Sequence, residues 1–170
     1  MSNPRKPLRI NVGFLINNEV GYSHEFPFDF EKIQIADDLD LRRFVGSLHI
    51  GRTPQGLLVT GKFEGELDLE CVRCLSEFSQ TIRWEITELY AFNENSVTDS
   101  ELIVPEDAQI DFAPLLRDYA FTEIPIKPVC KPDCKGLCPV CGQDLNKKDC
   151  GHRFEENNSP FASLKDLLNH

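Results

Sequence analysis

The stretch Leu57-Leu-Val-Thr-Gly-Lys-Phe-Glu-Gly-Glu-Leu-Asp-Leu-Glu-Cys71 decides the fold, because its residues alternate in character with a period of two. Apolar or small residues take the odd positions and polar residues the even ones, with Leu58 as the exception. This alternation is typical of an antiparallel strand with one buried face. The preceding Thr53-Pro54-Gln55-Gly56 has the composition of a tight turn. An antiparallel sheet is therefore the expected centre of the fold.

The residues on either side of this stretch predict further strands. Downstream, one face of a second strand carries Phe78, Ile82, Trp84 and Ile86. Because only Cys71-Val-Arg-Cys-Leu-Ser76 joins the two strands, we expect a hairpin. Upstream, 26–30 alternates and 33–35 resumes the pattern after a one-residue offset, as a strand with a bulge would. The segment 41–50 has a further extended pattern.

The rest of the chain predicts helices at two places. Residues 93–110 are polar and acidic and indicate a loop or linker. Asp111 can cap a helix that runs to about Thr122 and ends before Pro125. Ser159-Pro160 is a typical start for a last helix. The apolar residues of that last helix would be Phe161, Leu164, Leu167 and Leu168.

The predicted fold class is α+β. It comprises an antiparallel β-rich body, the helix after Asp111, a zinc-ordered Cys-rich loop and a short terminal helix. We expect two parts, with 1–126 as the β-rich body with its following helix and 127–170 as the Cys-rich segment with the C-terminal helix.

Charge and composition narrow the function classes. The formal net charge is -10, which argues against broad, unaided binding to nucleic-acid phosphate or to anionic membrane. Between Lys127 and Arg153, six Lys or Arg and three Asp give +3 and leave -13 for the remainder. No run of ~18 apolar residues predicts a transmembrane helix. No apolar region follows the cationic Met1–Arg9 segment, so we expect a soluble cytoplasmic protein.

Cysteines give the strongest chemical signal. Five of the seven lie between Cys130 and Cys150, and an odd, closely spaced set suits a metal site better than a disulfide framework. The piece Cys138-Pro-Val-Cys141-Gly142 has the spacing of a zinc knuckle, in which two thiolates converge on one ion and the glycine takes positive φ. Zinc needs four ligands. The second pair is expected from Cys130, Cys134, Cys150 and His152.

The expected cofactor is Zn²⁺, because this segment of about 25 residues is too poor in apolar side chains to order itself without a metal. Cys71 and Cys74 leave three alternatives open. They are a second knuckle sharing an ion with Cys138 and Cys141, a redox pair, or plain structural residues. Seven cysteines and His152 make eight ligands, enough for two closed sites.

Basic residues near the cysteines have two interpretations. They offset the thiolate charge, or they contact RNA phosphate. The candidates for RNA contact are Arg73, Lys131, Lys135, Lys147 and Lys148. Trp84 is expected in the core and His49 as a structural histidine. No phosphate loop, Ser/His/Asp grouping or HExxH motif occurs, so we expect no catalytic residue and no enzyme activity.

Three strings of residues resemble the YceD family over about Leu41 to Leu168. They are Cys71-x-Arg-Cys-Leu-x-x-Phe78, Cys134-Lys-Gly-Leu-Cys-Pro-x-Cys-Gly-x-x-Leu-Asn146 with Cys150, and Pro160-Phe-Ala-x-Leu-Lys165. The resemblance implies a role in accumulation of large-subunit ribosomal RNA, with plant relatives in chloroplasts. Some members resemble the first string yet lack the later cluster, which implies that the Cys71 turn does not depend on that cluster. Many members have Cys where this chain has His152.

The preferred hypothesis is a non-enzymatic ribosome-biogenesis factor for large-subunit ribosomal RNA. Its partners would be ribosomal RNA or a pre-ribosomal particle, and the acidic remainder would face a basic ribosomal protein. The alternative is a zinc-dependent protein-interaction adaptor unrelated to ribosomal RNA. A third interpretation is a thiol oxidoreductase that uses Cys71 and Cys74.

Overall fold

The computed structural model describes residues 6–152, which form two compact units. Of the described residues, the first unit contains 6–69 and Ser79–Ile126. The second contains Glu70–Phe78 together with 127–152. The sequence-based division at residue 126 assigned Glu70–Phe78 to the first part, whereas in the structure this turn belongs with the cysteine-rich segment. The predicted last helix, with Phe161, Leu164, Leu167 and Leu168, lies outside the described residues.

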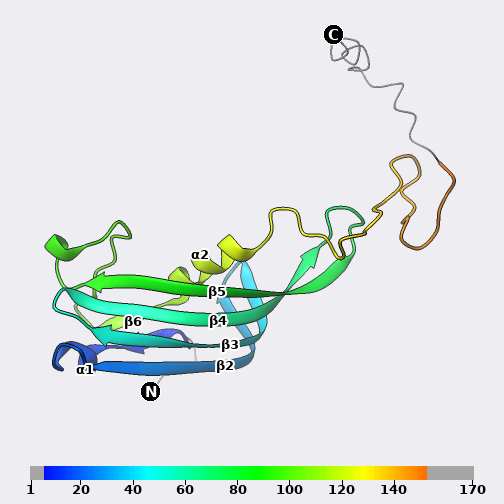
Figure 1. Cartoon of the computed structure of the whole chain (residues 1–170). Coiled ribbons are helices and arrows are strands. Elements are labelled where there is room, and N and C mark those ends of the chain that lie inside the picture. The colour runs from blue at the N-terminus through cyan, green and yellow to red at the C-terminus, as the bar shows by residue number, and fades with distance from the viewer. Residues whose placement is uncertain (1–5, 153–170) are drawn as a thin grey trace, which may run out of the picture. The chain divides into compact units, whose positions relative to one another are not determined.

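Four long strands form the sheet of the first unit (Figure 1). They are β2 (Ser23–Ala36), β3 (Leu39–Arg52), β4 (Gly56–Glu70) and β5 (Glu77–Ala91), and they are hydrogen-bonded in chain order. The pairs β2–β3 and β3–β4 are antiparallel. The antiparallel β-rich body predicted from the alternating residues is therefore confirmed.

The one-residue offset in the alternation of apolar residues that was predicted between 26–30 and 33–35 is present on β2. A corresponding offset is present on β3. Inward-facing side chains shift by one position between Phe30 and Ile33 on β2, and between Leu41 and Phe44 on β3. Against β4, β3 has a register shift between Arg42 and Val45, within which Arg43 adopts a left-handed φ of 47°. A bulge of this kind strengthens the local twist. The β2–β3 hairpin accordingly bends toward the helix side of the sheet (Figure 1).

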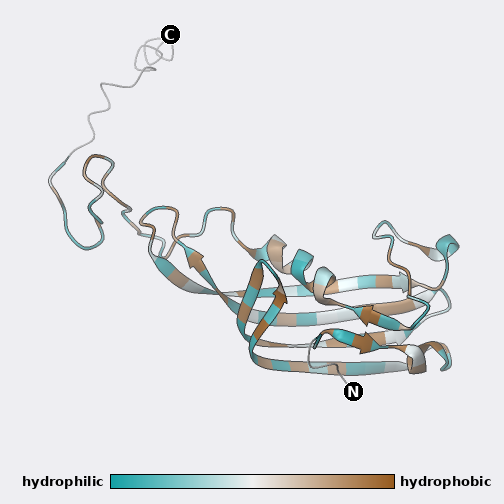
Figure 2. Ribbon diagram, turned by 180° about the vertical axis from the view of Figure 1, so that it is seen from behind, coloured by the Kyte–Doolittle hydropathy of each residue, from teal (hydrophilic) through white to brown (hydrophobic). Residues whose placement is uncertain are grey.

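Aromatic rings from neighbouring strands build the centre of the core. The rings of Phe44 and Phe63 stack at 5.5 Å, and Phe63 stacks on Trp84 at 5.6 Å. The ring of Phe28 on β2 lies 6.4 Å from that of Phe44. Teal and brown alternate along the strands in Figure 2, as expected for a sheet with one face buried. The expected core position of Trp84 is confirmed.

Shorter elements complete the first unit. Strands β1 (Arg9–Asn11) and β6 (Gln109–Asp111) pair antiparallel, and helix α1 (Gly13–Ile16) follows β1. The sequence patterns predicted none of these three short elements. The region 93–110 contains the 3-10 helix η1 (Glu94–Ser96), and one bridge pairs Ala91 with Ile103.

The predicted helix after Asp111 is α2 (Ala113–Glu123). The predicted cap at Asp111 is wrong, because the N-cap residue of α2 is Phe112, which makes no side-chain cap. Asp111 is the last residue of β6, and its carboxylate accepts a hydrogen bond from the Ala113 N–H at 3.1 Å. Leu116 and Ala120 face the core. No helix within residues 6–152 is long and apolar enough to cross a membrane.

Candidate metal centres

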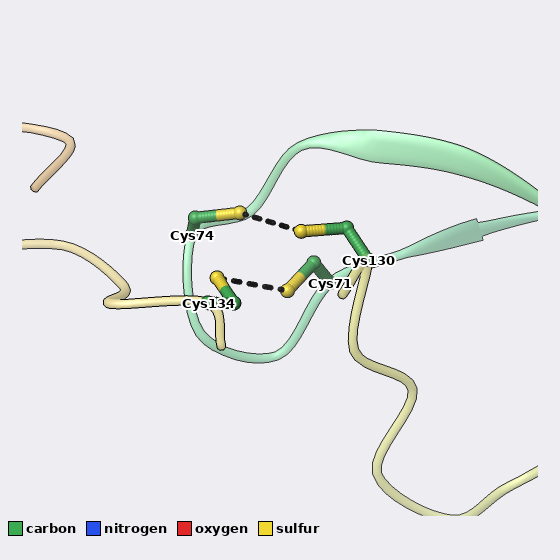
Figure 3. Close-up of side chains that lie close together, drawn as sticks. All are labelled: Cys71, Cys74, Cys130 and Cys134. Atoms are coloured by element: carbon green, nitrogen blue, oxygen red, sulfur yellow. Dashed lines mark hydrogen bonds between the residues drawn. The ribbon is translucent and has the colours of Figure 1, made fainter. Parts of the chain in front are cut away.

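Four cysteines from two distant segments meet in the second unit. Cys71 and Cys74 come from the turn after β4, and Cys130 and Cys134 follow α2 (Figure 3). Cys71 Sγ lies 3.9 Å from Cys134 Sγ, and Cys74 Sγ lies 3.6 Å from Cys130 Sγ. All four sulfur atoms lie within 4.8 Å of one another. We call this set the all-cysteine group.

These separations fit four thiolates around one ion. Zinc–sulfur bonds of about 2.3 Å in a tetrahedron place sulfur atoms about 3.8 Å apart. A disulfide needs a sulfur–sulfur distance of about 2 Å, and all seven cysteines are free. The all-cysteine group therefore has the spacing to hold a tetrahedral metal ion.

A second set of ligands lies later in the same unit. Cys138, Cys141, Cys150 and His152 bring their sulfur or nitrogen atoms within 4.8 Å of one another. Cys138 Sγ lies 3.8 Å from His152 Nδ1, close to the about 3.5 Å expected around tetrahedral zinc. We call this set the histidine-containing group. It is more exposed than the all-cysteine group, because Cys141 and His152 are open to solvent.

Both Cys-x-x-Cys turns have the same backbone geometry. The Leu75 N–H donates to the Cys71 carbonyl at 2.9 Å, and the Gly142 N–H donates to the Cys138 carbonyl at 2.8 Å. Leu75 and Gly142, each directly after the second cysteine of its pair, have positive φ values of 56° and 74°. The positive φ expected for Gly142 is confirmed. The turn after β4 thus has the backbone geometry of the Cys138–Gly142 turn, with a leucine where glycine is the usual residue.

Backbone N–H groups stabilise one thiolate in each group. Burial opposes ionisation of Cys71, but the N–H groups of Cys130, Cys74 and Arg73 lower its pKa to about 6. The N–H groups of Cys141 and Val140 likewise lower the pKa of Cys138 to about 6. Thiolates are the form that binds metal, so these turns are preorganised for a cation.

Neighbouring thiols make further ionisation harder. Burial, followed by the nearby Cys74 and Cys134 side chains, raises the pKa of Cys130 to about 12. At Cys150 the His152 N–H lowers the thiol pKa, but Cys138, burial and Cys141 outweigh it and the net pKa is raised. Packing several thiolates together without a counter-charge is unfavourable, and a divalent cation would remove that cost.

Side chains that are not ligands fix the all-cysteine group. The Asn146 amide donates to Cys134 Sγ at 3.4 Å, and its oxygen accepts the Lys135 N–H at 2.9 Å. The Ser76 hydroxyl lies 3.0 Å from Cys74 Sγ and is the largest cause of the lowered Cys74 pKa. Such contacts orient metal ligands. No local sequence pattern predicts these roles of Ser76 and Asn146, because both contacts depend on how the turns fold.

Arg73 joins the two segments of the second unit. Its guanidinium donates to the Cys134 carbonyl at 2.9 Å, and its own carbonyl accepts the Leu137 N–H at 2.9 Å. At Gly136, with φ of 76°, an added Cβ would lie 2.9 Å from that Arg73 carbonyl. Arg73, a candidate for RNA contact, thus has structural contacts in this unit.

The lysine candidates lie on the surface of the second unit. Lys131 is 3.9 Å from Asp133, and Lys147 is 3.7 Å from Asp144. Lys135 and Lys148 are exposed, with no ion pair to a described residue.

The structure settles which of the candidate ligands lie together. It places Cys71 and Cys74 with Cys130 and Cys134, not with Cys138 and Cys141. The family resemblance implied that the Cys71 turn does not depend on the later cluster, and this stays a prediction, although Cys130 and Cys134 lie beside that turn. Two residues of that cluster complete the group around the turn.

Comparison with known proteins gives one family. The model described as "Large ribosomal RNA subunit accumulation protein YceD" matches residues 59–168. An uncharacterized protein of Mycobacterium tuberculosis is 37% identical over 136 residues, which cover 77% of this chain and 61% of that protein. The chain thus spans about three fifths of the length of such mycobacterial relatives. No solved structure matches.

Two plant relatives match over shorter stretches. Both are named large ribosomal RNA subunit accumulation protein YCED homolog 1, chloroplastic. The protein of Zea mays is 48% identical over 61 residues, 34% of this chain and 21% of the relative. The protein of Arabidopsis thaliana is 38% identical over 63 residues, 37% of this chain and 20% of the relative.

Proposed function

The chain belongs to the YceD family, and from this we propose that it is a non-enzymatic ribosome-biogenesis factor supporting the synthesis, processing or accumulation of large-subunit ribosomal RNA. The observation that carries the proposal is the family match over residues 59–168, a range that includes every candidate ligand of both groups. The plant relatives named for this process match over part of the chain, which agrees with a shared biochemical role.

The proposal includes two structural zinc ions, one in each group of ligands. Sets of four sulfurs, or three sulfurs and one nitrogen, in a tetrahedron favour zinc over hard cations such as Mg²⁺. Zinc would supply no redox chemistry. It would order a unit whose own apolar cluster is small: buried Cys71, Cys74 and Cys134, with four partly buried residues packed on them.

In this proposal the protein acts in the cytoplasm by binding ribosomal RNA and a ribosomal protein, without catalysing a reaction. The ordered second unit presents Lys135 and Lys148 to RNA phosphate, and the acidic first unit faces a basic ribosomal protein. A reducing compartment keeps the free thiols available for metal.

Metal analysis tests the zinc proposal. Protein purified without chelators should contain about two equivalents of zinc, measured by plasma mass spectrometry together with iron. Cys74→Ser and Cys141→Ser should each lose one equivalent, and the double variant both. His152→Ala should behave like Cys141→Ser, whereas the matched control His49→Ala, in strand β3, should keep both. A purified protein that contains no metal and still has an ordered second unit would disprove the zinc proposal.

Cell experiments test the ribosomal role. Deletion of the gene should lower the ratio of large- to small-subunit ribosomal RNA, and the protein should sediment with pre-ribosomal particles. Complementation with Cys74→Ser should fail, and complementation with His49→Ala should succeed. An unchanged ratio with no particle association would rule the proposal out.

The alternative, a zinc-dependent adaptor unrelated to ribosomal RNA, is favoured by the acidic balance of the chain. Pull-down with and without ribonuclease separates the two. An adaptor would keep its partners after ribonuclease treatment, and those partners would not belong to the ribosome.

A further inference from the structure

Strand β2 forms one edge of the sheet (Figure 1). In the described part of the chain, β3 is the strand to which it pairs. Next to its other side lies a groove of about 780 Å³ within the first unit. β1 and α1 contribute Ile10 and Phe14 to this groove, and β2 contributes Phe26, Phe28 and Phe30.

Aromatic rings continue from the groove toward the start of β2. Phe14 lies 5.4 Å from His24 and 6.3 Å from Phe26, and it is 41% exposed. Tyr22, also 41% exposed, lies 6.5 Å from Phe14. Exposed apolar surface concentrated in this way is typical of an interaction site.

The intervening residues of β2 carry an unneutralised acidic row. Glu25, Asp29 and Glu31 alternate with the phenylalanines and are exposed. Within residues 6–152, no lysine or arginine pairs with any of the three.

The other strands differ in this respect. On β3, β4 and β5, part of the acidic side chains are matched by basic ones, in the ion pairs Arg42–Asp68, Arg43–Glu66, Lys62–Glu85 and Arg83–Glu64. On β2, by contrast, three carboxylates without an ion pair to any described residue follow one side of the edge strand, beside the groove.

We propose that this edge binds an extended polypeptide segment in which apolar residues alternate with Lys or Arg. Side chains of an extended segment point alternately to its two sides. One row would fill the aromatic groove and the other would meet Glu25, Asp29 and Glu31. Backbone groups on the open edge add hydrogen bonds, as in strand addition, except at Pro27, which has no N–H.

Charge disfavours the other occupants. A second copy of this chain would place one acidic row against another, and RNA would bring phosphates to unpaired carboxylates. The inference deepens the proposed function, because it supplies a surface for the basic protein partner, and it rests on that function for its biological role.

The test uses the full-length, metal-loaded protein and a fluorescent synthetic peptide. The peptide alternates valine with lysine over about ten residues, enough to lie along Ser23–Lys32. Glu25→Lys/Asp29→Lys/Glu31→Lys should weaken binding by about tenfold or more. The control Glu94→Lys/Asp99→Lys/Glu106→Lys makes the same change in net charge on the loop after β5, and should change affinity by less than about threefold.

Two further experiments test the contribution of apolar contacts between the aromatic groove and the peptide. Phe14→Ser, at a half-exposed ring, should also weaken binding, and so should replacement of valine by serine in the peptide. Amide shifts of the wild-type protein on peptide addition should cluster along β2, β1 and α1, which keeps the test valid if a variant misfolds.

Three outcomes would overturn the inference. The first is an equal loss of peptide affinity in both triple variants. The second is tighter binding of an oligouridine than of the peptide at this edge. The third is a wild-type protein that is dimeric and a β2 triple variant that is monomeric. If the peptide does not bind but deletion of the gene still lowers the ratio of large- to small-subunit ribosomal RNA, this inference alone is wrong. Peptide binding without any ribosomal RNA phenotype removes the proposed function alone.

Discussion

Breaking the all-cysteine group should release the second unit and leave the sheet intact. Cys74→Ser removes one of four ligands. The group ties together residues that are 56 and 63 positions apart, Cys74 with Cys130 and Cys71 with Cys134. If the metal-bound group is treated as a cross-link, closing a loop of this length adds about 4 kcal/mol to the free energy of unfolding. The histidine-containing group spans 14 positions from Cys138 to His152, and its closure is worth about 3 kcal/mol.

Hydrogen exchange with mass spectrometry measures this difference by segment. In Cys74→Ser, amides of Glu70–Phe78 and 127–134 should exchange about a thousandfold faster, since each 1.4 kcal/mol is a factor of ten. Amides of β3 and β4 should keep their protection, because their aromatic core belongs to the other unit. Cys141→Ser is the matched control and should accelerate 138–152 while the Glu70–Phe78 turn stays protected.

Two results would refute this reasoning. Unchanged protection of both segments in Cys74→Ser would mean that the thiolates do not hold the unit together. Simultaneous loss of protection in β3 and β4 would mean that the two units unfold as one.

Three other predictions follow from single residues. Asn146→Ala should weaken metal retention by the all-cysteine group about 10- to 100-fold in competition with a chromogenic chelator, because the Cys134 sulfur loses a donor; unchanged retention would contradict this role. Leu75→Gly should raise the unfolding free energy of the second unit by up to about 1 kcal/mol, because glycine adopts φ of 56° without strain; a loss in chemical denaturation would show that Leu75 packing matters more. Burial, with the charges of Glu88 and Asp111, raises the pKa of Tyr90 to about 12, so stability should fall between pH 10 and 12, where the unfolded tyrosine ionises first. Tyr90→Phe should flatten that decline in alkaline melts, and an identical decline would refute the assignment.

Period-two patterns allowed most of the sheet to be predicted. In β4 and β5 one face is buried over many residues, so the alternation is long enough to identify the strand and its inward side. The end of the helix after Asp111 was predictable from Pro125 beyond it, whereas its start was not, because Phe112 and not Asp111 is the N-cap residue. Strands β1 and β6 have three residues each and pair across about a hundred positions, so neither carries a local pattern.

By itself, the sequence determined which residues are candidate ligands and the local geometry of the Cys138–Gly142 turn, because Cys-x-x-Cys followed by glycine is a local pattern, whereas it left the role of Cys71 and Cys74 open. Only the tertiary structure decided how the ligands divide. Cys138 has its partners within 14 residues, but Cys71 is brought to Cys134 only because the chain between them, which includes β5, β6 and α2, folds back. Local spacing fixes short loops, whereas a loop of 63 residues can close in many ways, and the packed sheet and helix select one of them.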